Sequence, residues 1–195
     1  GDAANDIGKQ TGGWTVSWQG TDNKPEHYRG STSILQGIKA EVASHGGEVV
    51  FSASGEAPKD ADVAIVIFGE TPYVEMKGDR EHLVFSRFNS RPLRQLAALR
   101  KQGIPTVVVF LSGRPMVVSD EIELAEAFIA AWLPGSEGAA IADALFARDG
   151  FNFKGTLPFS WPHTEQQKVL NFDDEFYMPK YPLGYGLRTR LKRSH

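Results

Sequence analysis

Residues 62–80 read DVAIVIFGETPYVEMKGDR, an apolar run that passes directly into a polar loop. The run 62–68 is apolar on both faces, which is typical of a central strand in a parallel sheet. Open α/β sheets hold their functional groups in loops at the carboxyl ends of such strands. The loop here carries four charged side chains, Glu70, Glu75, Lys77 and Asp79. We therefore expect this loop to carry the chemistry of the protein.

Helices and strands alternate before and after this stretch. A helix is predicted over residues 31–44, capped by Ser31 or Thr32, because its apolar residues recur at helical spacing. A second helix begins after Ser90 and ends at Gly103. The other predicted elements are a strand at 48–52, a strand at 106–111, a short acidic helix near 120–126 before the apolar run AFIAAWL, a helix between Pro134 and Gly150, and a strand at 157–161.

This order predicts an α/β domain with a mainly parallel sheet and helices on both faces. The expected architecture is a three-layer sandwich, flavodoxin-like or Rossmann-like. The chain of 195 residues is long enough for one full domain, and no linker divides it. We therefore expect residues 1–195 to form a single domain.

The first thirty residues are rich in glycine and contain the segment GGWTVSWQG at 12–20. Trp14, Val16 and Trp18 alternate, which favours a strand with both indoles on one face. Exposed indoles in such a segment form a platform for the apolar faces of sugars, whereas buried ones would be ordinary core residues. The residues alone leave both interpretations open.

Composition and missing motifs exclude several kinds of site. The net charge of −3 argues against nucleic acid, and the basic C-terminal residues Arg188, Arg190, Lys192 and Arg193 are interpreted as a solvated tail. The absence of cysteine excludes disulfides and thiolate chemistry. No apolar run approaches the roughly 20 residues of a membrane span. We expect neither a nucleic acid nor a membrane as partner.

Cofactor and metal sites are not predicted either. The chain has no G-x-G-x-x-G, no phosphate-binding P-loop and no G-x-S-x-G motif. Its five histidines are scattered rather than clustered with carboxylates. Carboxylate chemistry remains, because an apolar and aromatic setting raises the pKa of a carboxyl group toward neutrality. The residues alone do not choose among Glu70, Glu75 and Asp79.

Five segments, in order, make the sequence similar to the C-terminal α/β sandwich domain of family 3 glycoside hydrolases, the β-glucosidase and exo-β-glucanase group. Together they span nearly the whole chain. They are DIGKQTGGWTVSWQG (6–20), GETPYVEMKGD (69–79), LSGRPMVV (111–118), AAWLPGSEGAAIADALF (130–146) with GTLPFSWP (155–162), and YPLGYGL (181–187).

This resemblance implies a role for particular residues. Glu75 lies in a P-Y-x-E segment and would be the catalytic acid and base. Trp18 would stack on the sugar just beyond the scissile bond, and Trp14 would either bind sugar too or support Trp18 from behind. Arg114, in the G-R-P turn, would be structural. The reaction would be retaining double displacement that releases glucose from the non-reducing ends of β-glucans or β-glucosides.

The resemblance also implies a partner. An N-terminal (β/α)8 barrel would carry the aspartate nucleophile, and the barrel and the first strand of the second domain are both missing from this chain. The chain alone is therefore expected to be inactive. The alternatives are a non-catalytic carbohydrate-binding domain or a scaffold domain. The G-G-W-T…W pattern resembles periplasmic, secreted and apoplastic members, which implies an extracytoplasmic location.

Overall fold

The structure is a computed structural model that describes residues 1–189, and it confirms the α/β class. Three parallel strands form one sheet in the order β1-β2-β3. They are β1 (Ala64–Gly69), β2 (Thr106–Leu111) and β3 (Ala127–Trp132). The predicted strands at 62–68 and 106–111 are thus confirmed, and the third strand occupies the run AFIAAWL. The basic C-terminal residues Arg190, Lys192 and Arg193 lie outside the described residues.

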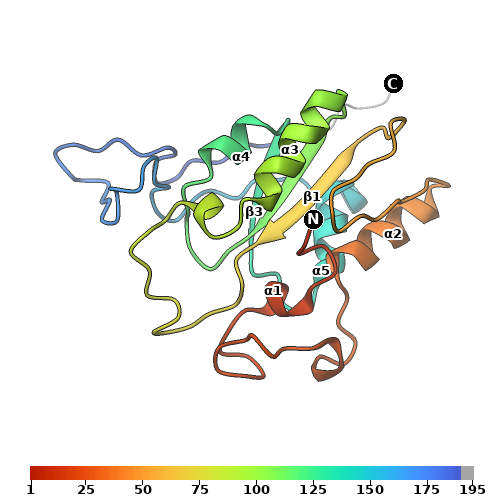
Figure 1. The fold of residues 1–195 in the computed structure, drawn as a ribbon, viewed down its shortest axis with the longest axis horizontal. Coiled ribbons are helices and arrows are strands. Elements are labelled where there is room, and N and C mark those ends of the chain that lie inside the picture. Colours follow the sequence, from red (N-terminus) through yellow and green to blue (C-terminus); the bar gives the residue numbers. More distant parts are fainter. Residues whose placement is uncertain (190–195) are drawn as a thin grey trace.

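Helices cover both faces of the sheet, as predicted for a three-layer sandwich (Figure 1). The helices α3 (Arg91–Gln102) and α4 (Ser119–Glu123) lie on one face. The helices α2 (Ile34–Ser44) and α5 (Gly138–Leu145) lie on the other. The remaining helical turns are α1 (Ile7–Thr11) and the three short 3-10 turns Pro25–His27, Phe85–Arg87 and Arg148–Gly150. None of the helices in the described part of the chain is long and apolar enough to cross a bilayer.

Two apolar cores explain why β1 and β2 are apolar on both faces. Phe68, Phe85 and Phe110 form an aromatic cluster beneath α3, with ring centroids 5.2–5.4 Å apart. On the opposite face, Ile67 and Val109 pack against α2 and α5. Because neighbouring strand residues point to opposite faces, each core receives alternate residues of the same strand.

The start of α2 shows how polar side chains fix the helices around the sheet. Its cap is Ser33, not the predicted Ser31 or Thr32: Ser33 Oγ accepts from Gln36 N at 3.1 Å, and Gln36 Oε1 accepts from Ser33 N at 2.7 Å. This reciprocal pair is a capping box. The buried side chain of Gln10 donates to the carbonyls of Thr32 and Gly135, so it ties α1 to the starts of α2 and α5.

Two predicted strands are wrong. Residues 48–52 form no strand, and Val50 and Phe51 are exposed although their apolar pattern suggests burial. Residues 157–161 form no strand either, apart from a single antiparallel bridge between Trp161 and Tyr181. Pro158, inside this segment, and Pro162, just after it, lack the N–H groups that a longer ladder needs.

A groove lies between residues 48–52 and β1. β1 is an edge strand, and an apolar groove of about 470 Å³ runs beside it. Leu35 and Ile38 of α2 line the groove, and Val49 and Phe51 line it from the unpaired segment. The segment therefore lies beside β1 without hydrogen bonding to it as a strand.

Glu121, on α4, is a buried carboxyl group whose removal is expected to stabilise the fold. Its side chain is 2% exposed, and its Oε1 has no hydrogen-bond partner among the described residues. Burial raises the pKa of Glu121 above its usual value. A raised pKa in the folded state means that stability is lost as the pH rises through that pKa. Ionisation of Glu121 therefore opposes folding above its unfolded pKa.

We expect Glu121→Gln to raise the melting temperature at about pH 8 by about 2–4 °C, corresponding to about 1 kcal/mol, with little gain at about pH 4. Thermal unfolding followed by circular dichroism measures this. Glu123→Gln is the matched control, because the Glu123 side chain on the same helix is 72% exposed. An equal gain for Glu121→Gln at both pH values would contradict the prediction.

Candidate active site

Two loops meet at the carboxyl end of β1. One loop, residues 12–20, follows α1; the other, residues 70–79, follows β1. Figure 1 shows both loops, red and olive, extending from the same end of the molecule. Three hydrogen bonds among the described residues connect them. The prediction that the end of this strand opens into a polar loop is confirmed, and a second loop covers it.

The loop at 12–20 is a turn, so the predicted strand through Trp14, Val16 and Trp18 is wrong. Trp14 has a φ of 54°, in the left-handed region, and its N–H donates to Trp18 O at 2.9 Å. Gly20 also has a positive φ, 78°, which glycine adopts without steric penalty. These backbone angles bend the segment back on itself instead of extending it.

Both indoles are nevertheless exposed and adjacent. Trp14 is 68% exposed and Trp18 is 45% exposed, with ring centroids 6.1 Å apart and planes tilted by 58°. They are therefore not ordinary core residues. Trp14 lines a cavity together with Glu75, whereas Trp18 lies against the side chain of Glu75.

Glu75 begins a tight turn and its side chain is exposed. Trp18 Nε1 donates to Glu75 Oε2 at 3.2 Å. The turn is closed by Gly78 N, which donates to Val74 O at 2.7 Å. The described residues do not provide the apolar enclosure that the sequence led us to expect around a catalytic carboxyl group, because the outer side of Glu75 faces solvent.

Gly13 allows the two loops to come into contact. A β-carbon at this position would lie 2.8 Å from Tyr73 O, closer than side chains approach a backbone oxygen. Any larger residue at this position would push the indole loop away from Glu75. The glycine before Trp14 is thus required by the close approach of the two backbones.

The other two carboxylates of the loop have structural roles. Asp79 Oδ2 accepts from Met76 N at 3.2 Å and caps the turn. Glu70 is 8% exposed and accepts from Tyr73 Oη at 2.8 Å, Ser112 Oγ at 3.0 Å and Arg114 Nε at 3.2 Å. Glu70 is thus enclosed by its partners, whereas Asp79 and Glu75 are both exposed and each accepts a hydrogen bond.

Arg114 links both ends of the loop, in keeping with the structural role expected for it. Its Nε binds Glu70 at the start of the loop, and its Nη1 donates to Gly78 O, near the end, at 2.7 Å. The guanidinium also lies 4.0 Å from the centroid of the Tyr73 ring, which is a cation–π contact. Burial raises the pKa of Tyr73 well above its usual value, and the Glu70 carboxylate raises it further, so the phenol stays a donor to Glu70.

Several residues of the site were not singled out from the sequence. Lys9 Nζ pairs with Asp2 Oδ2 at 2.8 Å and donates to Gly69 O at 3.2 Å, at the carboxyl end of β1. Tyr73, inside the 70–79 loop, donates to Glu70, and Gln19 accepts from Val74 N of that loop. A Lys or Gln in a glycine-rich segment has no periodicity that would reveal such contacts. The available signal was that these residues lie in segments 6–20 and 69–79, which carry the family resemblance.

The cavity at this site has a volume of about 460 Å³ and an open mouth. Its lining combines Lys9, Trp14, Tyr73, Glu75 and Leu133. No cluster of three metal-ligating His, Asp or Glu side chains occurs in residues 1–189. The arrangement offers an exposed carboxyl group, Glu75, beside an indole, and such a group can transfer a proton to or from a bound molecule.

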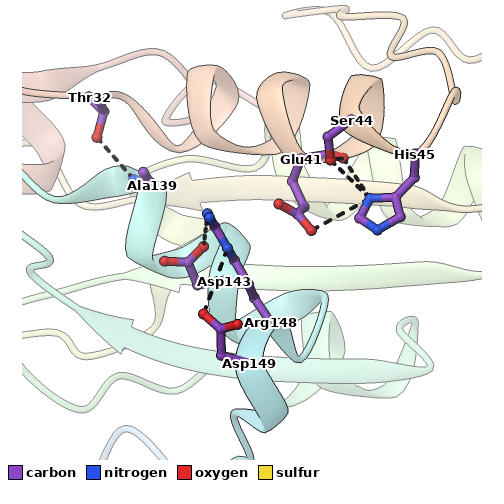
Figure 2. Close-up of polar contacts among 8 residues, drawn as sticks. All are labelled: Thr32, Glu41, Ser44, His45, Ala139, Asp143, Arg148 and Asp149. Atoms are coloured by element: carbon purple, nitrogen blue, oxygen red, sulfur yellow. Dashed lines mark hydrogen bonds and ion pairs between the residues drawn. The ribbon is translucent and has the colours of Figure 1, made fainter.

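A larger cavity of about 720 Å³ lies between α2 and α5, and Figure 2 shows its charged residues. Arg148 pairs with Asp143 at 3.3 Å and with Asp149 at 4.0 Å. His45 Nδ1 lies 3.0 Å from Glu41 O and 3.6 Å from Glu41 Oε1. Each ionisable side chain of this cavity thus lies within 3.3–4.0 Å of a partner of opposite type.

Comparison with known proteins gives a consistent result. The family model described as the glycosyl hydrolase family 3 C-terminal domain matches residues 1–189. The chain is 30% identical to a periplasmic beta-glucosidase of Salmonella typhimurium, over 68% of this chain and 20% of that protein. It is also 30% identical to a lysosomal beta glucosidase of Dictyostelium discoideum, over 84% of this chain and 21% of that protein.

A solved structure is more similar still. The exo-1,3/1,4-beta-glucanase ExoP of a Pseudoalteromonas species matches 96% of this chain with a TM-score of 0.91 and 46% sequence identity. This chain covers 24% of the ExoP chain. The chain thus spans about a fifth to a quarter of the length of these relatives.

Proposed function

Because this chain belongs to glycosyl hydrolase family 3, as a C-terminal domain of that family, we propose that it supplies the catalytic acid and base of a retaining, exo-acting β-glucosidase or β-glucan glucohydrolase. The observation that carries the proposal is the Trp18–Glu75 pair at 3.2 Å, at the carboxyl end of β1. A carboxyl group beside an exposed indole combines a proton donor with a surface that fits a sugar ring.

In the proposed reaction, Glu75 acts twice. It first gives its proton to the glycosidic oxygen as the bond to the anomeric carbon breaks, and an aspartate attacks that carbon to form a glycosyl ester. The Glu75 carboxylate then takes a proton from water, and the resulting hydroxide displaces the aspartate. This double displacement retains the anomeric configuration and places the two carboxyl groups about 5–5.5 Å apart.

The aspartate nucleophile would come from an N-terminal (β/α)8 barrel. Two observations support a partner that covers this face. Glu75 and both indoles are exposed, and Glu70 is held by Tyr73, Ser112 and Arg114. A barrel docked over the loop would enclose Glu75 and provide the dry setting that proton transfer at neutral pH favours.

The substrate class follows from the relatives. Two of them are named beta-glucosidases and the third is an exo-1,3/1,4-beta-glucanase. We propose β-linked glucosides or gluco-oligosaccharides, with Trp18 stacked on the sugar beyond the scissile bond and Trp14 at the edge of the cavity. Aromatic rings bind sugars through their apolar C–H faces, so this placement requires no cofactor.

The groove beside β1 supports a second element of the proposal. A strand that precedes Gly1 in the parent enzyme would fit beside the start of β1, ahead of the point where Ala3 N donates to Ile67 O at 3.1 Å, because an edge strand presents N–H and C=O groups for pairing. Gly1 itself lines the groove, so a preceding residue would enter it. Val49 and Phe51 would then cover the far side of the added strand.

Hydrolysis of an aryl β-glucoside tests the proposal. We expect turnover by the complete enzyme, in which the chain is joined to its barrel, and none by this chain alone, since half of the carboxylate pair is absent. Binding of gluco-oligosaccharides to the chain alone, followed by tryptophan fluorescence, is the parallel measurement. Tight binding by the chain, together with a complete protein that hydrolyses no β-glycoside, would favour the carbohydrate-binding alternative and contradict the enzymatic one.

A further inference from the structure

Gln19 lies next to Trp18 and contacts the same residue from a different side. Its Nε2 donates to Glu75 O at 3.1 Å, and its Oε1 accepts from Val74 N at 3.0 Å. We propose that Gln19 is a positioning residue for Glu75, whose side-chain amide fixes the backbone that carries the catalytic carboxyl group. The inference rests on the proposed function of Glu75.

The two hydrogen bonds of Gln19 fix both the position and the orientation of the 70–79 loop. A single hydrogen bond would let the loop rotate about it, whereas a donor and an acceptor on one planar amide define a plane. Of the three hydrogen bonds that join the two loops among the described residues, Gln19 makes two. The third, from Trp18, reaches only the Glu75 carboxylate.

The other contacts of the loop do not replace Gln19. The bond from Gly78 N to Val74 O and the bond from Met76 N to Asp79 set the shape of the turn but not its place relative to Trp18. The Arg114 guanidinium holds Glu70 and Gly78, near the two ends of the loop. The middle of the loop, where Glu75 lies, is therefore connected to the rest of the molecule mainly through Gln19.

Gln19 is itself held on an ordered loop. Asn23 Nδ2 donates to Gly12 O at 3.0 Å and to Thr15 Oγ1 at 2.9 Å, which fixes the base of the loop. The Gln19 side chain is half-buried between the loops. An amide on such a support can hold the backbone of Glu75 in place. This matters for the rate, because misplacement of a reacting group by about 1 Å lowers rates by about 10²-fold.

The test uses Gln19→Ala in the complete enzyme and two substrates that differ in their need for an acid. Phenyl β-glucoside has a poor leaving group and requires protonation, whereas dinitrophenyl β-glucoside has a good one and does not. We expect kcat/KM to fall by about 10–100-fold for the phenyl substrate and by less than about 3-fold for the dinitrophenyl substrate. Retained activity on the dinitrophenyl substrate also shows that the variant is folded.

Two further variants make the result decisive. Gln36→Ala removes an amide of the α2 capping box, and we expect it to lower the melting temperature without any leaving-group dependence. Gln19→Glu keeps the acceptor for Val74 N but loses the donor to Glu75 O, and we expect it to show the same leaving-group dependence as Gln19→Ala. Equal losses on both substrates, or no loss on either, would overturn the positioning role.

Comparison of Glu75→Ala with Gln19→Ala distinguishes failure of the proposed function from failure of the positioning role. If Glu75→Ala keeps full activity on the phenyl substrate, the proposed function fails and the inference fails with it. If Glu75→Ala loses that activity while Gln19→Ala does not, the positioning role alone is wrong.

Discussion

Substitution of Glu75 by alanine in the complete enzyme is expected to lower kcat/KM for phenyl β-glucoside by about 10²–10⁴-fold, the range that a general acid contributes. Without the carboxyl group, the departing oxygen leaves as an unprotonated phenolate, and no base activates water in the second step. Initial-rate kinetics on the purified enzyme give the ratio directly.

Chemical rescue separates loss of the acid from loss of the fold. Azide needs no base to attack the glycosyl-enzyme, so we expect it to restore turnover of dinitrophenyl β-glucoside by Glu75→Ala and to give a β-glucosyl azide. Glu81→Ala is the control, since Glu81 is an exposed carboxylate just beyond the loop, and its kinetics should match the unsubstituted enzyme. Full activity of Glu75→Ala on phenyl β-glucoside would remove Glu75 from the mechanism.

Substitution of Glu70 by alanine is expected to lower the free energy of unfolding by about 3–5 kcal/mol, the usual effect of removing one partner of a buried ion pair. The change would leave the Arg114 guanidinium, which is 20% exposed, and the hydroxyls of Tyr73 and Ser112 without their shared acceptor. It would also release the start of the loop that carries Glu75, so activity should fall together with stability.

Urea unfolding of Glu70→Ala, Arg114→Ala and the double variant measures the coupling. We expect the double variant to be less destabilised than the sum of the two single variants, because the second change no longer leaves a charge unpaired. The matched control is the exposed pair of Arg148 and Asp143, whose side chains are 58% and 44% exposed. Breaking that pair should change stability by no more than about 1 kcal/mol. Strict additivity for Glu70 and Arg114 would contradict the proposed coupling.

The layered fold was largely predictable because its signals are local. The apolar runs that form β1 and β2 are continuous, and α2 and α3 have helical spacing with clear stop signals at Gly46 and Gly103. The segment at 48–52 has the pattern of a strand, but a strand also needs a neighbour to pair with, and pairing is not encoded locally. α1 has five residues, too few for a periodic pattern to appear.

The loop at 12–20 shows a different limit. Alternation of Trp14, Val16 and Trp18 is compatible with a strand, yet the backbone turns at Trp14 with a φ of 54°. The conformation is stabilised by contacts with distant residues, such as the close approach of Gly13 to Tyr73. Sequence patterns within nine residues do not contain that information.

The sequence predicted where the candidate site lies more fully than which residues form it. The end of a parallel strand indicated where to look, and the family resemblance selected Glu75, whose catalytic role stays a prediction. The geometry adds that Glu70 and Asp79 accept hydrogen bonds that fix the shape of the loop. The role of Gln19 could not be predicted from the sequence, because its partners are backbone groups. Every residue has such groups, so no residue pattern marks them.

β1 is an edge strand whose outer side forms a backbone hydrogen bond from Ala3 N to Ile67 O, and binding of a further segment at this edge would stabilise the domain. A segment that binds this edge in the folded domain, and not in the unfolded chain, stabilises the folded form by RT ln(1 + [L]/Kd). The loop that carries Glu75 continues directly from β1, so it shares in that stabilisation. For a segment joined covalently to Gly1, the effective concentration is high and constant. Under the proposed function, linking this domain to a barrel in one chain would then keep the loop in place as well as bring Glu75 to the nucleophile.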